Sequence, residues 1–477
     1  MRKIIEAVLP ITQDYGIPLI LNDDPVMALE TGCDGVHIGQ EDTDYISTRK
    51  IVGRDAIVGV TCLGSIDLAM QAAERGADYV AFGAFFPSKT KNSAGKPKLD
   101  IKIEKLSKVE TWITAAQPSD DGWSQIKPFI FIRLTTSEGI QGWGEAFTLP
   151  YRELAVETII RNLVIAIANE KNISPYSFRD KILDIADKHR GIDFSAATSA
   201  IEMALWDIIG KLSKKPLSHL LCENPNPSVP IYATNWSSIE SETKTVARRA
   251  LNLVEQNFGG IKIYPLQNRT PNEGASFVSY TRDLIGFEAP LMLDLASPDN
   301  SNLSYELAPL VAPSNPYWYE EPVDGENTEE LSAIRAKTGL RIVTGEKQFG
   351  LPHFKKTLEA KAADILNPDI AAVGGIIDMM QISKWSLEKN VKLSPHCWNS
   401  MSIAAAAMLH VCVSIKNSEM AEIFPEYLTF VKKFSEPGYK IDQGHAFLNN
   451  EPGLGVSLDT LLLQSICSNY NEEILER

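Results

Sequence analysis

Five ionisable residues recur at nearly constant spacing in the second half of the chain. Asp294, Glu320, Glu346, Asp369 and His396 follow one another at intervals of 26, 26, 23 and 27 residues, and each ends a short apolar run. A strand of about five residues, a helix of about twelve and two short loops fill such an interval, so each predicts one βα unit. Successive βα units close into a barrel and place the carboxyl ends of their strands at one mouth. We therefore expect the five side chains to converge there.

The first three of these residues predict a metal site. Taken singly, Asp294, Glu320 and Glu346 could be a helix cap, a first-turn acid and a loop charge. Three acids at neighbouring strand ends would repel one another, and a bound cation is the simplest way to neutralise them. Carboxylate oxygens without a Cys or His among them favour a hard divalent cation, Mg²⁺ first and Mn²⁺ second.

The stretch "YWYEEPV", Tyr317–Val323, runs three aromatic residues into two adjacent acids and a proline. We interpret the aromatic run as a barrel strand that Pro322 helps to end. Only one of Glu320 and Glu321 is then expected to point into the mouth, because neighbouring residues of a strand face opposite ways.

Asp369 and His396 suit proton transfer. An aspartate that accepts a hydrogen bond from one imidazole nitrogen fixes the tautomer and raises the basicity of the other nitrogen.

Lys262 and Tyr264 lie two apart in "IKIYP" and share one strand face on another side of the mouth. That arrangement fits a reaction in which one group removes a proton and another donates one. Lys262 is expected to balance an anionic substrate and to lower the pKa of Tyr264 from about 10.

The elements that position these residues follow from the wider pattern of the chain. At 477 residues, two or three domains are expected. Residues 1–101 alternate β-rich runs with helical stretches, and the lysine-rich "GKPKLDIKIEKL" marks the junction. "FIFIRLTTSEGIQGWGEA" predicts a hairpin turning at residues 137–139, and "AATSAIEMALWDIIGKLSKK" predicts a helix. The βα alternation returns at Ile231 and continues to about residue 440.

Composition narrows the classes of partner and compartment. A formal net charge of -15 and a pI near 5.1 argue against nucleic acid or an anionic membrane as partner. The N-terminus does not read as a signal peptide, and the apolar run from Met401 is short enough to be a core helix. The cysteines form no C-x-x-C pair, which favours a reducing cytoplasm over a disulfide framework; they are Cys33, Cys62, Cys222, Cys397, Cys412 and Cys467.

From Lys102 onward, the chain resembles the mandelate racemase and muconate-lactonizing group of the enolase superfamily. The matching motifs cover about four fifths of the chain in the family's order: "GIQGWGEA", "AIEMALWDIIGK", "GGIKIYP", "LMLD", "WYEEP", "TGE", "NPDIAAVGGI", "LSPH" and "EPGLG". The resemblance implies an α+β capping domain, residues 102–228 with the tail 441–477, over a (β/α)7β barrel at 229–440. It also implies Mg²⁺ on the three acids, a His396–Asp369 dyad, a homo-oligomer, and contact of Glu422 with the carboxylate of a small-molecule substrate.

The chemistry that the resemblance implies begins with removal of the proton α to a carboxylate, which gives an enediolate. Loss of a β-hydroxyl would make the enzyme a dehydratase, reprotonation a racemase or epimerase, and a ring step a cycloisomerase. Two departures bear on the choice: Tyr264 stands where many members have a second lysine, and Ala296 where an asparagine often follows the first ligand. Tyr264 favours dehydration of a sugar acid, with the roles of base and acid open between Tyr264 and His396.

The first hundred residues resemble a different barrel enzyme, thiamine phosphate synthase. The resemblance covers "LILNDD", "GVHIGQED" and "FFPSKTK", and spans about half of that family's length. It implies metal or diphosphate contacts at Asn22, Asp23, Asp42, Thr90 and Lys91. A half barrel exposes two open sheet edges, so this partial βα segment is expected to be inactive alone. The alternative is a thiamine phosphate synthase-type transferase that another chain completes.

Overall fold

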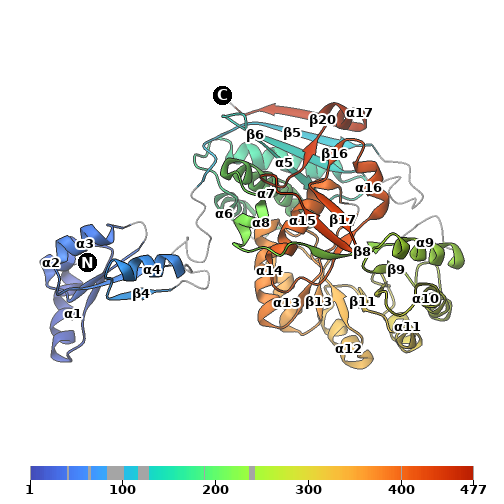
Figure 1. Cartoon of the computed structure of the whole chain (residues 1–477), viewed down its shortest axis with the longest axis horizontal. Helices are drawn as coiled ribbons and strands as arrows, with labels where there is room; N and C mark the ends of the chain where they lie inside the picture. The colour runs from blue at the N-terminus through green and yellow to red at the C-terminus, as the bar shows by residue number, and fades with distance from the viewer. Residues whose placement is uncertain are drawn as a thin grey trace. The chain divides into compact units, whose positions relative to one another are not determined.

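The computed structural model describes residues 2–39, 42–62, 66–82, 101–115, 128–186, 189–235, 242–398 and 400–475. The chain forms two compact units, Met1–Leu99 and Asp100–Arg477 (Figure 1). Each unit has its own hydrophobic core and is described separately.

The N-terminal unit is a four-stranded parallel sheet with helices between its strands. The strands are β1 (Ile20–Asn22), β2 (Gly35–Ile38), β3 (Ile57–Thr61) and β4 (Tyr79–Ala81), in spatial order β1-β2-β3-β4. The helices are α1 (Arg2–Asp14), α2 (Pro25–Thr31), α3 (Tyr45–Val52) and α4 (Ile66–Glu74). Val36, Ile38, Val58 and Val60 lie in its core. The predicted βα alternation is confirmed, and the described part forms four of the eight strands that a closed barrel needs.

The larger unit begins with an antiparallel sheet. Its strands run in spatial order β20-β5-β6-β7 and are β5 (Leu106–Thr114), β6 (Ile130–Thr136), β7 (Gln141–Ala146) and the C-terminal β20 (Cys467–Ile474). The predicted hairpin is confirmed, with Gly139 at φ 84° in its turn. The last strand pairs with β5, so the end of the chain joins the sheet that opens this unit.

Helix α7 (Ile192–Ser213) packs closely on β7 in this capping layer. A Cβ atom at Gly144 would lie 1.9 Å from the carbonyl oxygen of Ala200, and one at Gly142 would lie 2.1 Å from that of Ala204. Both glycines of "GWG" are therefore required by the close approach of the helix backbone. The layer also contains α5 (Glu153–Ile167), α6 (Pro175–Ala186) and α8 (Leu217–Leu221).

The rest of the larger unit is a parallel barrel. Its strands are β8 (Val229–Thr234), β9 (Ile261–Ile263), β10 (Leu291–Asp294), β11 (Trp318–Glu320), β12 (Ile342–Thr344), β13 (Ile365–Leu366), β14 (Lys392–Leu393) and β15 (Ala421–Ile423). The helices that alternate with them are α9 (Thr243–Glu255), α10 (Pro271–Ile285), α11 (Asn302–Val311), α12 (Thr328–Thr338), α13 (Leu351–Glu359), α14 (Ile376–Glu388) and α15 (Ser402–Ser414). In Figure 1 the helices from α9 to α13 lie outside the strands. This is the predicted (β/α)7β arrangement.

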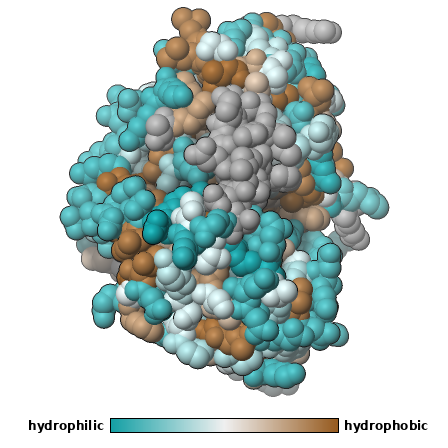
Figure 2. Space-filling view, turned by 90° about the vertical axis from the view of Figure 1, so that its right-hand side faces the viewer, coloured by the Kyte–Doolittle hydropathy of each residue, from teal (hydrophilic) through white to brown (hydrophobic). Residues whose placement is uncertain are grey.

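The ring closes where the last strand meets the first. β15 pairs in parallel with β8, and Leu393 at the end of β14 bridges Ser418 just before β15. A hairpin of β17 (Tyr439–Asp442) and β18 (His445–Leu448) adds antiparallel to β8. The described helices include none with the length and apolarity to span a bilayer. On the face in Figure 2, hydrophobic residues form separate groups among hydrophilic ones.

Candidate active site

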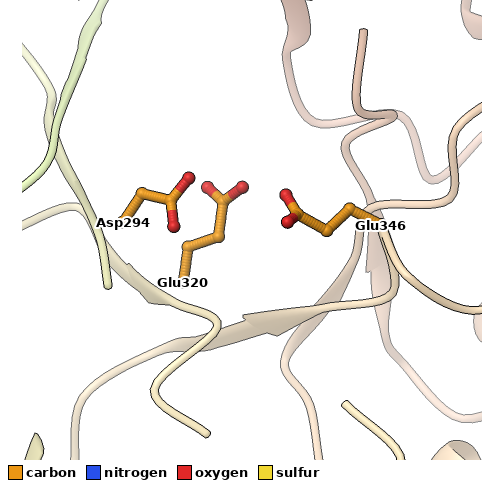
Figure 3. A group of neighbouring side chains, drawn as sticks. All are labelled: Asp294, Glu320 and Glu346. Carbon is orange, nitrogen blue, oxygen red and sulfur yellow. The ribbon is translucent and has the colours of Figure 1, made fainter. Parts of the chain in front are cut away.

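The three predicted metal ligands meet at the carboxyl ends of neighbouring barrel strands. Asp294 and Glu320 are the last residues of β10 and β11 and are paired in register, and Glu346 follows the end of β12 by two residues. One carboxylate oxygen from each lies within 4.8 Å of the others, and Figure 3 shows the three carboxylates turned toward one another. Asp294 and Glu320 are buried, and Glu346 is partly buried. The predicted convergence is confirmed.

The chemistry of this cluster fits a hard divalent cation. All its possible ligand atoms are carboxylate oxygens. Burial raises the pKa of Glu320 well above its ordinary value and that of Glu346 to about 7, with further contributions from neighbouring acids. The site therefore favours protons or a cation at these oxygens. Trp318 Nε1 and Asn367 Nδ2 donate to Glu320 at 2.9 and 3.0 Å and hold its orientation.

Lys262 lies among the acids. Its side chain is fully buried, and Nζ is 2.8 Å from Oε1 of both Glu320 and Glu422 and 3.3 Å from Oδ2 of Asp294. Burial alone would lower the pKa of Lys262, but Glu320 and Glu422 raise it well above its ordinary value. Sequence spacing predicted a cation that faces the substrate, whereas Lys262 is already paired with carboxylates of the chain.

Tyr264 follows β9 directly, and the centre of its ring lies 5.9 Å from Lys262 Nζ. The expectation that Lys262 lowers the pKa of this tyrosine is wrong in its net direction. Burial raises the pKa of Tyr264 well above 10, and the charges of Asp294 and Glu422 add to that effect, while Lys262 opposes it. The Tyr264 hydroxyl is therefore a proton donor at neutral pH.

Asp369 and His396 lie side by side after β13 and β14 and form a parallel bridge. His396 Nδ1 is 2.9 Å from Asp369 Oδ2, and the backbone N–H of Ala371 donates to the other Asp369 oxygen at 2.8 Å. His396 Nε2 faces Glu346 Oε2 at 3.4 Å and Glu422 Oε2 at 3.9 Å. Burial opposes protonation of the imidazole, but the surrounding carboxylates, Glu346 first, raise the pKa of His396 to about 9.

Glu422 lies in β15 on the same mouth and is held by several donors. Thr234 Oγ1 donates to Oε1, and the backbone N–H of Cys397 donates to Oε2 at 2.9 Å. Burial would raise the pKa of Glu422, but Lys262 and His396 lower it to about 2. The predicted contact of Glu422 with a substrate carboxylate stays a prediction.

Sequence reasoning gave no function to the second acid of "YWYEEPV". Both acids are fully buried, but Glu320 turns toward Asp294 and Glu346 (Figure 3), whereas Glu321 has a positive φ of 43° and bonds other residues. The Glu321 carboxylate accepts from Ser297 Oγ and Thr344 Oγ1 at 2.7 Å, and from Gly345 N–H at 3.1 Å. It therefore ties together the carboxyl ends of β10, β11 and β12, where the three acids lie. The sequence signal that could have indicated this role is the pair of adjacent acids at the end of a strand, of which only one can point into the mouth.

The structure describes three of the residues predicted in the N-terminal unit, and their role stays a prediction. Asn22 ends β1, Asp23 follows it with φ 73°, and the Asp42 carboxylate accepts from the backbone N–H of Gly39 at 2.6 Å. Thr90 and Lys91 lie outside the described residues. Of all the described acids, histidines and cysteines, only the trio in the barrel forms a cluster suited to a metal.

Comparison with known proteins places the larger unit in a family. Residues 245–461 match the family described as enolase C-terminal domain-like, and residues 118–222 match the N-terminal domain of mandelate racemase and muconate lactonizing enzyme. A solved enolase from the environmental genome shotgun sequencing of the Sargasso Sea is 47% identical, with a TM-score of 0.76 over 78% of this chain and 100% of its own. The chain belongs to the enolase superfamily.

The names of other superfamily relatives state that they act on sugar acids. The D-galactonate dehydratase of Klebsiella pneumoniae (strain 342) is 27% identical over 375 residues, which cover 74% of this chain and 92% of the relative. The solved 3,6-anhydro-D-galactonate cycloisomerase of Zobellia galactanivorans is 25% identical, with a TM-score of 0.70 over 76% of this chain and 100% of its own. These relatives support enolase-superfamily chemistry of the sugar-acid dehydratase kind.

The N-terminal unit matches a different family. Residues 1–114 match the family described as thiamine monophosphate synthase. The thiamine-phosphate synthase of Rhodospirillum centenum (strain ATCC 51521 / SW) is 58% identical over 89 residues, 19% of this chain and 43% of that relative. The chain thus spans less than half the length of this relative, in agreement with the predicted partial barrel.

Proposed function

We propose that the enolase-like unit removes the proton α to the carboxylate of a sugar acid, an aldonate or aldarate, and eliminates water from the resulting enediolate. The observation that carries this proposal is the acid trio within 4.8 Å, at the same barrel mouth as the His396–Asp369 pair. Asp294, Glu320 and Glu346 would hold Mg²⁺. When bound, the cation would supply positive charge against the anion that forms as the proton leaves.

His396 is proposed as the base and Tyr264 as the acid. Asp369 holds Nδ1 of His396, which leaves Nε2 directed toward the mouth. The charge of Glu346 is the leading cause of the raised imidazole pKa, so a cation on Glu346 favours the neutral, basic form of His396. The Tyr264 hydroxyl is protonated and can donate to the departing β-hydroxyl.

The assignment is tested by separating proton exchange from loss of water. A library of acid sugars is screened with Mg²⁺ for 2-keto-3-deoxy products, and the best substrate is then followed in deuterium oxide. His396→Asn should lose both α-proton exchange and dehydration. Tyr264→Phe should keep exchange and lose dehydration. Loss of exchange in Tyr264→Phe with retention in His396→Asn would reverse the two roles, and the absence of turnover on every acid sugar would overturn the function.

A racemase, epimerase or cycloisomerase of the same superfamily is the second candidate. The solved cycloisomerase relative favours it, whereas Tyr264 in place of a second lysine disfavours a two-base racemase. Incorporation of solvent deuterium without loss of water identifies an epimerase, and a product isomeric with the substrate that contains a ring identifies a cycloisomerase.

We propose that the N-terminal unit takes no part in this reaction. Its homology covers 43% of the thiamine-phosphate synthase relative. Removal of residues 1–101 should leave the sugar-acid activity intact. Thiamine phosphate formation by the full chain, lost on this removal, would instead support the transferase alternative.

A further inference from the structure

Glu145 of the capping layer holds the start of a barrel helix. It is the fifth residue of β7 and is 2% exposed. Its Oε1 accepts from the backbone N–H of Met401 at 2.7 Å, and its Oε2 accepts from that of Ala404 at 2.9 Å. These N–H groups belong to the first turn of α15, where a helix leaves its N–H groups without internal partners. Met401 at the N-cap position offers no side-chain hydrogen bond, so Glu145 performs the capping from another layer of the fold.

This cap lies five residues after His396 in the chain. Next to His396, the N–H of Cys397 donates to Glu422 Oε2 at 2.9 Å. At the start of the helix, Met401 is held by its bond to Glu145. His396, whose ring lies 2.9 Å from Asp369, is thus close in the chain to both anchors.

The same end of β7 also contacts the segment that follows Asp369. The N–H of Phe147 donates to the carbonyl of Ala371 at 3.1 Å, two residues after Asp369. The ring of Phe147 lies 5.8 Å, centre to centre, from that of Trp398, two residues after His396. Glu145 and Phe147 thus join one capping strand to both segments that carry the predicted proton-transfer pair.

We propose that Glu145 is a positioning residue for the His396–Asp369 pair. Through Glu145, the position of β7 and of Phe147, which directly follows it, would affect the orientation of the His396 imidazole. The inference rests on the proposed function for its effect on turnover, but the placement of the His396 ring can be measured without any substrate.

The test compares Glu145→Gln with Glu157→Gln. Glutamine keeps the size of the Glu145 side chain but turns an NH₂ group toward one of the two backbone donors. Glu157 is a matched control, because it is also 2% exposed in the capping layer and bonds Thr111 Oγ1 at 2.8 Å and Arg161 Nε at 2.7 Å. Its partners Thr111, Arg161 and Asn471 belong to β5, α5 and β20 of the capping layer.

Imidazole nitrogen NMR of the metal-free protein is the first readout, with His396→Asn assigning the signal. Glu145→Gln should shift the His396 resonances, while Glu157→Gln leaves them unchanged. Unchanged His396 resonances in Glu145→Gln would overturn the inference, whether or not a substrate has been found.

Steady-state kinetics on the proposed sugar-acid substrate is the second readout. Glu145→Gln should lower kcat by about 10- to 100-fold, because a displacement on the order of 1 Å at a catalytic group costs about that much. KM and Mg²⁺ affinity should stay near wild type, and the pH profile of kcat should shift. Wild-type kcat and pH profile in Glu145→Gln would contradict the inference. If the wild-type protein turned over no sugar acid, the proposed function would fail, and the NMR result would still decide the role of Glu145.

Discussion

Replacing Glu346 by glutamine should stabilise the metal-free protein and remove its response to Mg²⁺. Glu346 is 14% exposed in its side chain, and its pKa rises from 4.5 to about 7, mainly through burial and with the charges of Asp294 and Glu321 adding to it. The pKa of about 7 already includes the attraction of His396, 3.4 Å away, which lowers it. At 1.36 kcal/mol per pKa unit, the ionised carboxylate destabilises the fold by about 3 kcal/mol.

The sign of this effect depends on pH. The folded protein binds the Glu346 proton more tightly than the unfolded chain does, so the unfolding free energy falls as pH rises from 4.5 through about 7. With EDTA at pH 8 the penalty is fully present in the wild type. Glu346→Gln should therefore unfold at a higher temperature, by about 4 °C for a unit of this size.

Added Mg²⁺ should remove most of this difference. At about a hundredfold excess over its Kd, a ligand that binds only the folded state stabilises it by about 2.7 kcal/mol. The variant keeps two of the three acids and should gain little. Thermal unfolding followed by circular dichroism at pH 5 and pH 8, with EDTA and with Mg²⁺, measures both effects. Glu359→Gln is the control, because Glu359 is 65% exposed and should change neither value. A variant less stable than wild type in EDTA, or one that Mg²⁺ stabilises equally, would refute the reasoning.

Three further predictions follow from individual contacts. Asp369→Asn should lower kcat by about 10²- to 10⁴-fold with Mg²⁺ affinity retained, because it frees the His396 tautomer; pH-rate profiles check this, and wild-type kcat would contradict it. Glu321→Gln should weaken Mg²⁺ binding by about 10-fold in calorimetry, since it loosens the segments that carry the ligands; unchanged affinity would show that those segments hold without it. Gly144→Ala should destabilise the larger unit by about 1 to 3 kcal/mol in urea unfolding, because its Cβ would meet the Ala200 carbonyl; an unchanged midpoint would mean that α7 can move away.

Much of the fold could be predicted because it depends on regular spacing along the chain. The interval between successive acids sets the length of a βα unit, and parallel strands must end at the same mouth, so the convergence of Asp294, Glu320 and Glu346 needed no knowledge of side-chain packing. The hairpin of β6 and β7 was equally local, since its prediction required only alternating apolar residues and a glycine turn.

The rest of the site depends on contacts between residues far apart in the sequence. Spacing placed Lys262 on the correct strand face but could not show that it pairs with Glu422, which is supplied by the last strand. The predicted direction of the shift in the Tyr264 pKa was wrong, because burial raises this pKa more than one nearby cation lowers it, and spacing does not reveal burial. The bonds from Glu145 to Met401 and Ala404 cross between two layers, so no local motif predicts them.

The pairing of β15 with β8 has a consequence for the order in which the molecule forms during synthesis. Lys262 leaves the ribosome long before Glu422, so a nascent chain carries that ammonium group without one of its closest counter-charges. Burying it early would be unfavourable. The barrel should therefore stay open until its final strand has been translated, and chaperones would meet it as a gapped sheet rather than a finished enzyme.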